Sequence, residues 1–350
     1  MRKTGIVKDR RYLNHGLDDG HPESPARLEA IYAMLETPDM EGKFVPIPPR
    51  LATHRELEYV HSPEYVNYIA ATAGQSYVIL DPDTETSPQS YETAKLAVGG
   101  VCNAIDFVLT RAGDNAFAFV RPPGHHAEYD EAAGFCIFNN IAIGAKFALS
   151  RHRLERILIV DWDLHHGNGT QRTFYESREV LYFSIHQYPG YPGSGAVEEI
   201  GLKKGLGYTI NVPLSFAAGD AQYLKVFRRI LEPVALNYKP QLVLVSAGFD
   251  ICLGDPLGQM RVTPPGFAAM TRCLMNLADH CCRGQIVLVL EGGYRAEALQ
   301  RSIKAVLLEM HDETRISDAD IADFEAKSGS RIEGTIKSVI DHIRPIWPTL

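Results

Sequence analysis

Five short apolar runs recur along the chain, each rich in β-branched or aromatic residues. They are AFAFV at residues 116–120, RILIVD at 156–161, VLYFSI at 180–185, QLVLVSA at 241–247 and QIVLVL at 285–290. Within these runs apolar residues follow one another instead of alternating with polar ones. This pattern is typical of parallel strands whose two faces are both covered by helices.

Longer segments with helical periodicity lie between the runs, at residues 138–152, 220–238 and 264–281, and an earlier one spans 24–36. Ser24 and Pro25 commonly start a helix, and Asp220 is a candidate cap for the segment that it opens. Alternating strands and helices predict an α/β fold with an open, doubly wound parallel sheet flanked by helices. No repeat, low-complexity tract or Ser/Gly linker interrupts the chain, so we predict a single domain over residues 1–350.

Composition argues against several classes of partner. The net charge is -8 and the basic residues are scattered, which disfavours direct binding to nucleic acid. No apolar stretch approaches the roughly 18 residues that a membrane span needs. The N-terminal sequence MRKTGIVKDRR is not followed by the apolar run of a signal peptide. The six cysteines form no CxxC pair, which favours reduced thiols. We therefore expect a cytoplasmic protein.

Ligands of doubly wound sheets bind beyond the carboxyl ends of the strands, so the segments after the five runs are the place to look for chemistry. The first is followed by RPPGHHAEYDEAAGFC. Neighbouring side chains on a regular strand point to opposite faces, so His125 and His126 can serve one site only in an irregular loop, which Pro-Pro-Gly favours. Such a pair could divide acid and base duties, although many histidine pairs are simply hydrogen-bonded structural residues.

The second run leads into VDWDLHHGNGTQ, residues 160–171. If the strand continues, Asp161, Asp163 and His165 point the same way. Two carboxylates and one imidazole suit a divalent ion such as Zn²⁺, whereas the alternative is a solvated, helix-capping aspartate cluster. Asp250 follows its strand in GFDICLGDPLG as Asp163 does, and could be a third metal ligand.

The last run is followed by EGGYRAE, in which Gly292 and Gly293 allow backbone angles closed to other residues. Tyr294 can therefore reach into the cleft, where its hydroxyl would act as an electrophile. The loop HQYPGYPGSG after the third run resembles a cleft wall. One metal, a histidine pair and a tyrosine at a single sheet edge fit metal-assisted hydrolysis.

The segments RPPGHHA, GFCIFNN, VDWDLHHGNGTQ, SAGFD, GDP and EGGY stand in the order seen in the histone deacetylase family. The chain resembles its class II branch and the related bacterial deacetylases from about Pro22 to Tyr294. This resemblance implies an arginase-deacetylase fold with about eight parallel strands. It also implies the roles of seven residues: zinc ligands Asp163, His165 and Asp250, general base and acid His126, electrostatic partner His125, its orienting residue Asp161, and Tyr294 bonded to the substrate carbonyl.

The resemblance further implies a structural K⁺ bound by backbone carbonyls of Asp161, Asp163 and His165, with Ser184 and Ile185 contributing. Gly134, Phe135 and Tyr191 match positions that line the acyl-lysine channel. Zn²⁺ is the expected catalytic ion, with Fe²⁺ as the alternative inside a cell because availability and affinity together decide occupancy.

Asn168 stands where class I members carry a second aspartate, as in class II members. An amide cannot stabilise an imidazolium by charge. We therefore expect His126 to protonate less readily than it would beside a carboxylate, and His125, backed by Asp161, to be the more basic of the two.

Substrate choice is less constrained. Polyamine-selective relatives carry an acidic gatekeeper where this chain has Leu257, which favours acetyl-lysine peptides or a broad range of acyl amides over acetylated polyamines. Cationic substrates of either kind would suit an acidic rim, for which the candidates are Asp18, Asp19, Glu85, Glu128, Asp130 and Glu131. The rival hypotheses are an arginase-type enzyme with two metals and a non-catalytic acyl-binding module.

Overall fold

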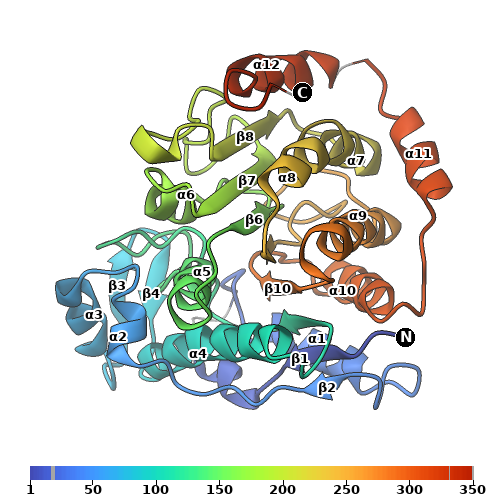
Figure 1. The fold of residues 1–350 in the computed structure, drawn as a ribbon. Coiled ribbons are helices and arrows are strands. Elements are labelled where there is room, and N and C mark those ends of the chain that lie inside the picture. Colours follow the sequence, from blue (N-terminus) through green and yellow to red (C-terminus); the bar gives the residue numbers. More distant parts are fainter. Residues whose placement is uncertain (17–19, 331, 349–350) are drawn as a thin grey trace.

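The computed structural model describes residues 1–16, 20–330 and 332–348 (Figure 1). A parallel sheet of eight strands forms its centre, in the order β2-β1-β5-β10-β9-β6-β7-β8. The strands are β1 (Thr4–Val7), β2 (Val45–Pro46), β5 (Asn115–Ala118), β6 (Ile157–Asp161), β7 (Val180–Gln187), β8 (Thr209–Leu214), β9 (Leu242–Ala247) and β10 (Ile286–Leu290). The predicted doubly wound α/β fold is confirmed.

Each of the five apolar runs overlaps one strand of this sheet, and these strands are β5, β6, β7, β9 and β10. The pattern did not predict β1, β2 or β8. A strand of four residues, TGIV, lies among charged residues, and β2 has two residues. Neither is long enough to form a recognisable apolar run.

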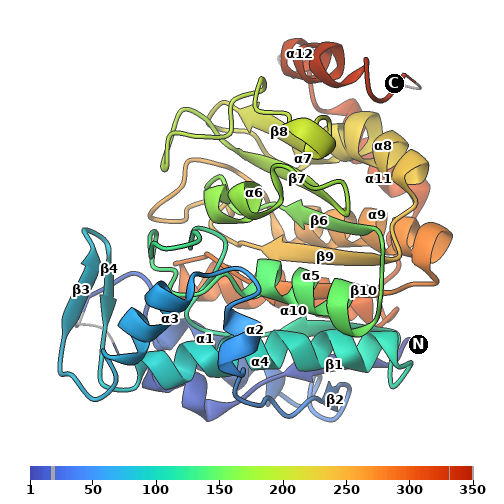
Figure 2. The ribbon, with the colours of Figure 1, turned by 60° about the vertical axis from the view of Figure 1, so that its left-hand side comes forward.

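Helices cover both faces of the sheet (Figure 2). One face carries α4 (Ser90–Leu109), α5 (Asn140–Arg151) and α6 (Asn168–Phe174). The other carries α1 (Ala26–Leu35), α7 (Asp220–Val226), α8 (Glu232–Tyr238), α9 (Pro264–Cys282) and α10 (Ala296–Met310). The remaining helices are α2 (His54–Leu57), α3 (Pro63–Ala70), α11 (Asp318–Ala326), α12 (Glu333–Ile343) and short 3₁₀ turns at Arg10–Asn14 and Lys203–Gly205. No described helix is both long and apolar enough to cross a bilayer.

The predicted helix over 220–238 is one helical segment with a π turn, Phe227–Leu231, between α7 and α8. Pro233 has no N–H to donate back into the preceding turn, which fits a change of hydrogen-bond pattern there. Asp220 is not the cap, as the sequence suggested, because Gly219 holds that position. The Asp220 carboxylate instead accepts hydrogen bonds from the N–H and the hydroxyl of Thr263, the cap of α9, at 2.7 Å each.

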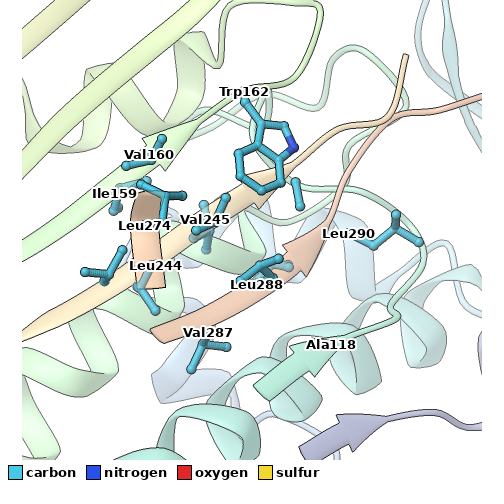
Figure 3. Close-up of a cluster of buried hydrophobic side chains, with 14 of the residues drawn as sticks. Ala118, Ile159, Val160, Trp162, Leu244, Val245, Leu274, Val287, Leu288 and Leu290 are labelled. Atoms are coloured by element: carbon cyan, nitrogen blue, oxygen red, sulfur yellow. The ribbon is translucent and has the colours of Figure 1, made fainter. Parts of the chain in front are cut away.

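The core lies between the sheet and its helices (Figure 3). Val160, Val245 and Leu288 are register partners on three neighbouring strands, and Trp162 lies beside them with no exposed surface. Burying one aliphatic side chain of this size contributes about 1.5–3 kcal/mol. The strands are therefore a rigid base for the loops at their carboxyl ends.

A two-stranded antiparallel hairpin, β3 (Val78–Asp81) and β4 (Thr84–Thr86), stands apart from the main sheet. The arrowheads of β6 and β9 point toward the side of the molecule that carries it (Figure 2). The hairpin thus lies on the same side as the loops in which the sequence placed the chemistry.

Candidate active site

Asp163, His165 and Asp250 form one cluster whose potential ligand atoms lie within 4.8 Å of one another. Nδ1 of His165 is 3.3 Å from Oδ1 of Asp163 and 3.3 Å from Oδ2 of Asp250. Strand β6 ends at Asp161, so the strand does not continue through Asp163 and His165, which was the condition for these two residues to point the same way as Asp161. Asp163 and His165 lie together in the irregular segment after β6. Asp250 lies three residues after the end of β9, the strand next to β6.

The two carboxylates are held so that oxygen atoms face the cluster. Oδ2 of Asp163 accepts the N–H of Gly292 at 2.9 Å, and Oδ1 of Asp250 accepts the N–H of Leu164 at 3.0 Å. Oδ2 of Asp250 is buried and accepts no hydrogen bond. Burial and the nearby Asp163 carboxylate raise the pKa of Asp250 to about 7. A buried, unsatisfied oxygen in an Asp-His-Asp set fits a divalent cation such as Zn²⁺.

The glycines before Tyr294 serve two different needs. A Cβ on Gly292 would lie 2.3 Å from Oδ2 of Asp250 and 2.7 Å from Oδ2 of Asp163, so the cluster leaves no room for a side chain. Gly293 has a φ of +116°, which L residues rarely adopt. The conformational explanation from the sequence therefore applies to Gly293, and close packing explains Gly292.

His125 is buried beside carboxylates. Its Nδ1 lies 3.1 Å from Oδ2 of Asp161, and its Nε2 lies 3.7 Å from Oδ1 of Asp163. The hydroxyl of Tyr182 donates to the same oxygen of Asp161 at 2.9 Å, which fixes that carboxylate. Burial opposes protonation of His125, but Asp161 and Asp163 outweigh it and raise its pKa to about 10.

His126 has a neutral partner. Its Nδ1 lies 2.7 Å from Oδ1 of Asn168, and its ring centre is 4.0 Å from that of His125. Burial, followed by the charges of His125 and His165, lowers the pKa of His126 well below its usual value. His125 is thus the more basic histidine, in the order that the Asn168 argument predicts.

Glu291 holds the histidine loop, a role that sequence reasoning missed although EGGY contains the residue. Its Oε2 accepts the N–H of Gly124 at 2.7 Å and that of His125 at 3.3 Å, and its Oε1 accepts the hydroxyl of Ser246 at 2.9 Å. Burial raises its pKa to about 7. One carboxylate therefore joins the loops after β5 and β10 to strand β9.

Tyr294 lines a cavity together with His125, His126 and His165. Its N–H donates to Oδ2 of Asp255 at 2.7 Å, and the Arg27 guanidinium lies 5.0 Å from its ring centre. Arg27 also donates to the carbonyl of Gly293 at 2.7 Å, which fixes the turn. Burial raises the pKa of Tyr294 well above its usual value, so its hydroxyl keeps its proton at neutral pH.

A narrow cavity of about 80 Å³ joins these groups to the surface, and its wall includes Gly134, Phe135, Tyr191 and Leu257 as expected. His125, His126, His165 and Tyr294 also line it. A Cβ on Gly134 would lie 2.2 Å from the ring of His126, so the wall touches the histidine directly. Asp83, which sequence reasoning missed, lines the cavity and accepts the N–H of Gly134 at 2.9 Å.

The acidic rim differs from the one expected. Asp81, Asp83 and Glu131 carry the charges that act on Tyr191 at the cavity. Glu128 points elsewhere, because its carboxylate accepts from Asn168 and pairs with Arg172. Two of the proposed rim residues, Asp18 and Asp19, lie outside the described residues.

The fold and this site are typical of metal-dependent hydrolases that have a candidate metal centre at the carboxyl edge of a parallel sheet. Among the described residues, one cluster of three such ligands was found, which gives no support to a two-metal arginase-type centre. Within this class, the chain belongs to the histone deacetylase family, a family of deacetylase hydrolases. The family described as "Histone deacetylase domain" matches residues 21–310.

Individual proteins that are similar to this chain support its membership of the family. "Histone deacetylase 15" of Arabidopsis thaliana is 39% identical over 99% of this chain and 63% of its own length. "Histone deacetylase clr3" of Schizosaccharomyces pombe is 40% identical over 87% of this chain and 48% of its own length. This chain therefore spans less than two thirds of the length of both proteins. A "Probable deacetylase" of Archaeoglobus fulgidus is 42% identical over 84% of this chain and 82% of its own length. The crystal structure of the HDA15 HD domain gives a TM-score of 0.89 at 37% identity, covering 99% of this chain and 96% of that one.

Proposed function

We propose that this protein is a metal-dependent deacetylase that removes acetyl or similar acyl groups from lysine side chains. The observation that carries this proposal is the meeting of the Asp163-His165-Asp250 cluster, His126 and Tyr294 at one narrow cavity. Amide hydrolysis needs an activated water, a stabilised oxyanion and a proton for the leaving nitrogen. Each requirement has a candidate group here.

Asp163, His165 and Asp250 would hold the ion. A divalent ion bound there would act as a Lewis acid on the acyl oxygen and lower the pKa of an adjacent water. Zn²⁺ suits two carboxylates and an imidazole, and Fe²⁺ is the alternative ion. The resemblance to the histone deacetylase family also assigns a structural K⁺ to the backbone carbonyls of Asp161, Asp163 and His165, with Ser184 and Ile185 contributing. Two of them, Asp161 and Ser184, are register partners on β6 and β7, which supports the assignment.

His126 moves the proton. With its Nδ1 proton donated to Asn168, its Nε2 is free to accept a proton from the attacking water. The same nitrogen then protonates the leaving amine as the bond between the acyl carbon and the nitrogen breaks. Tyr294 donates its hydroxyl proton as a hydrogen bond to the oxygen on which negative charge develops. His125 supplies fixed positive charge beside the site.

The narrow cavity fits a substrate whose acyl group is carried by a slender side chain. Leu257 is 41% exposed at the cavity and brings no carboxylate to the place of the polyamine gatekeeper. We therefore favour acetyl-lysine peptides or proteins as substrates, with acetylated polyamines as the second candidate. Asp81, Asp83 and Glu131 would attract cationic substrates of either type.

The test is kcat/KM of the Zn²⁺-loaded protein for an acetyl-lysine peptide and for acetylated putrescine, cadaverine and spermidine. Asp250→Ala is the control, since it removes a metal ligand and should abolish both turnover and tight binding of one Zn²⁺ per chain. A tenfold peptide preference supports the proposal. Leu257→Glu should then shift preference toward the polyamines.

Two outcomes would contradict it. A tenfold polyamine preference in the unchanged protein would assign specificity to the acidic rim. Tight binding of an acetylated ligand without turnover would instead favour a non-catalytic acyl-binding module on the same fold.

A further inference from the structure

We infer that Glu128 is a positioning residue, which acts through the Asn168 amide to keep the proton of neutral His126 on Nδ1 and leave Nε2 free. The inference rests on the proposed function, because a free Nε2 matters only if His126 is the base. Glu128 does not line the cavity, so it would act on the reaction only through Asn168.

Four side chains, His126, Asn168, Glu128 and Arg172, form a line from the cavity to the surface. Nδ1 of His126 lies 2.7 Å from Oδ1 of Asn168, and Nδ2 of Asn168 donates to Oε1 of Glu128 at 2.7 Å. Oε2 of Glu128 lies 3.2 Å from Nε of Arg172, whose side chain is 74% exposed. The Glu128 side chain is 16% exposed. The line thus runs from a buried imidazole to solvent.

The hydrogen-bonding capacities along the line leave one arrangement. An ionised carboxylate only accepts, so the atom of Asn168 that faces Glu128 must be its NH₂ group. The amide oxygen then faces His126, and Nδ1 must carry the proton because an amide oxygen cannot donate. Without Glu128, the NH₂ group would keep only the carbonyl of His126, at 3.5 Å, as an acceptor. The amide could then turn over and offer its NH₂ to Nδ1, which would place the imidazole proton on Nε2.

The backbone of Glu128 is fixed by a second histidine. Nε2 of His61 accepts the N–H of Asn139 at 2.9 Å, so its Nδ1–H donates to the Glu128 carbonyl at 2.7 Å. The Glu128 N–H donates to the carbonyl of Glu131 at 2.9 Å. With both backbone groups engaged, the carboxylate is directed at Asn168 by the loop itself.

The decisive variant is Glu128→Lys, because an ammonium only donates and should reverse the amide. We expect kcat to fall by about 100-fold or more, the usual contribution of a positioned base, with KM within about twofold. Glu128→Gln can still accept from Asn168 and should stay within about threefold of the unchanged protein. Glu128→Ala lets water replace the carboxylate and should cost about tenfold.

A compensating change tests the logic directly. Adding Asn168→Asp to Glu128→Lys provides an acceptor for both the new ammonium and Nδ1–H of His126. We expect the double variant to regain at least about tenfold in kcat over Glu128→Lys when each is measured at its own pH optimum. A purely structural role for Glu128 predicts no such recovery.

Glu176→Lys is the matched control. Glu176 is an exposed residue paired with Lys203 at 2.8 Å, and it lines a surface cavity together with Glu128 and Asn168. The substitution makes the same change in charge on the same face, and kcat should stay within about twofold. Thermal unfolding of every variant shows whether it folds. If Glu128→Lys does not fold, the inference is tested by comparing Glu128→Ala with Glu128→Gln. Equal kcat values for these two variants would overturn it.

A measurement that needs no turnover separates this inference from the proposed function. Nitrogen NMR of ¹⁵N-histidine-labelled protein distinguishes the two tautomers, with the His126 signals assigned by their loss in His126→Gln. We expect Nδ1–H in the unchanged protein and Nε2–H in Glu128→Lys. The same tautomer in both, or no recovery in the double variant, would overturn the inference. If the unchanged protein hydrolyses no acyl amide, the proposed function fails, and the tautomer alone decides the role of Glu128.

Discussion

His125 and His126 are consecutive residues with rings 4.0 Å apart, but they face different partners. The first lies beside the carboxylate of Asp161, and the second beside the amide of Asn168. The carboxylates help to raise the pKa of His125 to about 10, whereas burial and neighbouring positive charge lower that of His126. Residue 126 is therefore neutral where residue 125 is charged.

The difference shows how one loop can supply both a fixed charge and a mobile proton. A charged His125 cannot accept a proton, and its charge opposes protonation of the adjacent ring. A neutral His126 can accept one, and it returns the proton easily because its pKa is low. The division depends on the groups behind the two rings, since the rings themselves are chemically identical.

The largest effect expected is that of His126→Ala. Because this residue carries the proton, its removal should lower kcat/KM by about 100- to 10,000-fold. His125→Ala removes charge but no proton carrier, and should cost at least tenfold less. Steady-state kinetics on the acetyl-lysine peptide check both. His152→Ala, at a partly buried histidine outside the site that pairs with Asp106, is the control. Equal losses at the two loop histidines would refute the division.

Tyr294→Phe should come next, because it removes an oxyanion donor and leaves both histidines in place. We expect kcat/KM to fall by about 100- to 1000-fold. The shape of the pH profile should not change, since neither histidine loses its partner. Tyr182→Phe is the matched substitution: it removes a hydroxyl that supports His125 through Asp161, and should cost less than about tenfold. A loss under threefold for Tyr294→Phe would remove its assigned role.

Much of this arrangement could be predicted from sequence because its signals are local. Continuous apolar runs mark the buried strands, and the residues that follow them meet at one sheet edge whatever the strand order. That is why Asp163 and Asp250, which are 87 residues apart in the sequence, can be predicted from the sequence as ligands of one metal ion. Strands β1 and β8 were not predicted, because neither forms a continuous apolar run: β1 has four residues between charged neighbours, and in β8, TINVPL, Asn211 and Pro213 interrupt the apolar residues.

Residues that act through distant contacts could not be predicted. Glu291 matters because strand order places β10 beside β5, which puts its carboxylate under the N–H of Gly124. The sequence predicts Glu128 as a rim charge, because nothing in HHAEYDE shows that its side chain turns toward Asn168. Asp83 comes from the β3–β4 hairpin, whose weak strand pattern gave no signal.

The smallest effect should come from Asn168→Asp, which gives His126 the kind of partner that His125 has. A carboxylate stabilises the imidazolium, so the pKa of His126 should rise, by about one unit or more for an opposite charge at this distance. The base must be neutral to act, so the acid limb of kcat/KM against pH should move to higher pH by the same amount. At pH values above that limb, the loss should be less than about tenfold. An acid limb that stays in place, or moves to lower pH, would mean that residue 168 does not control protonation of His126, and the contrast between the two histidines would then need another cause.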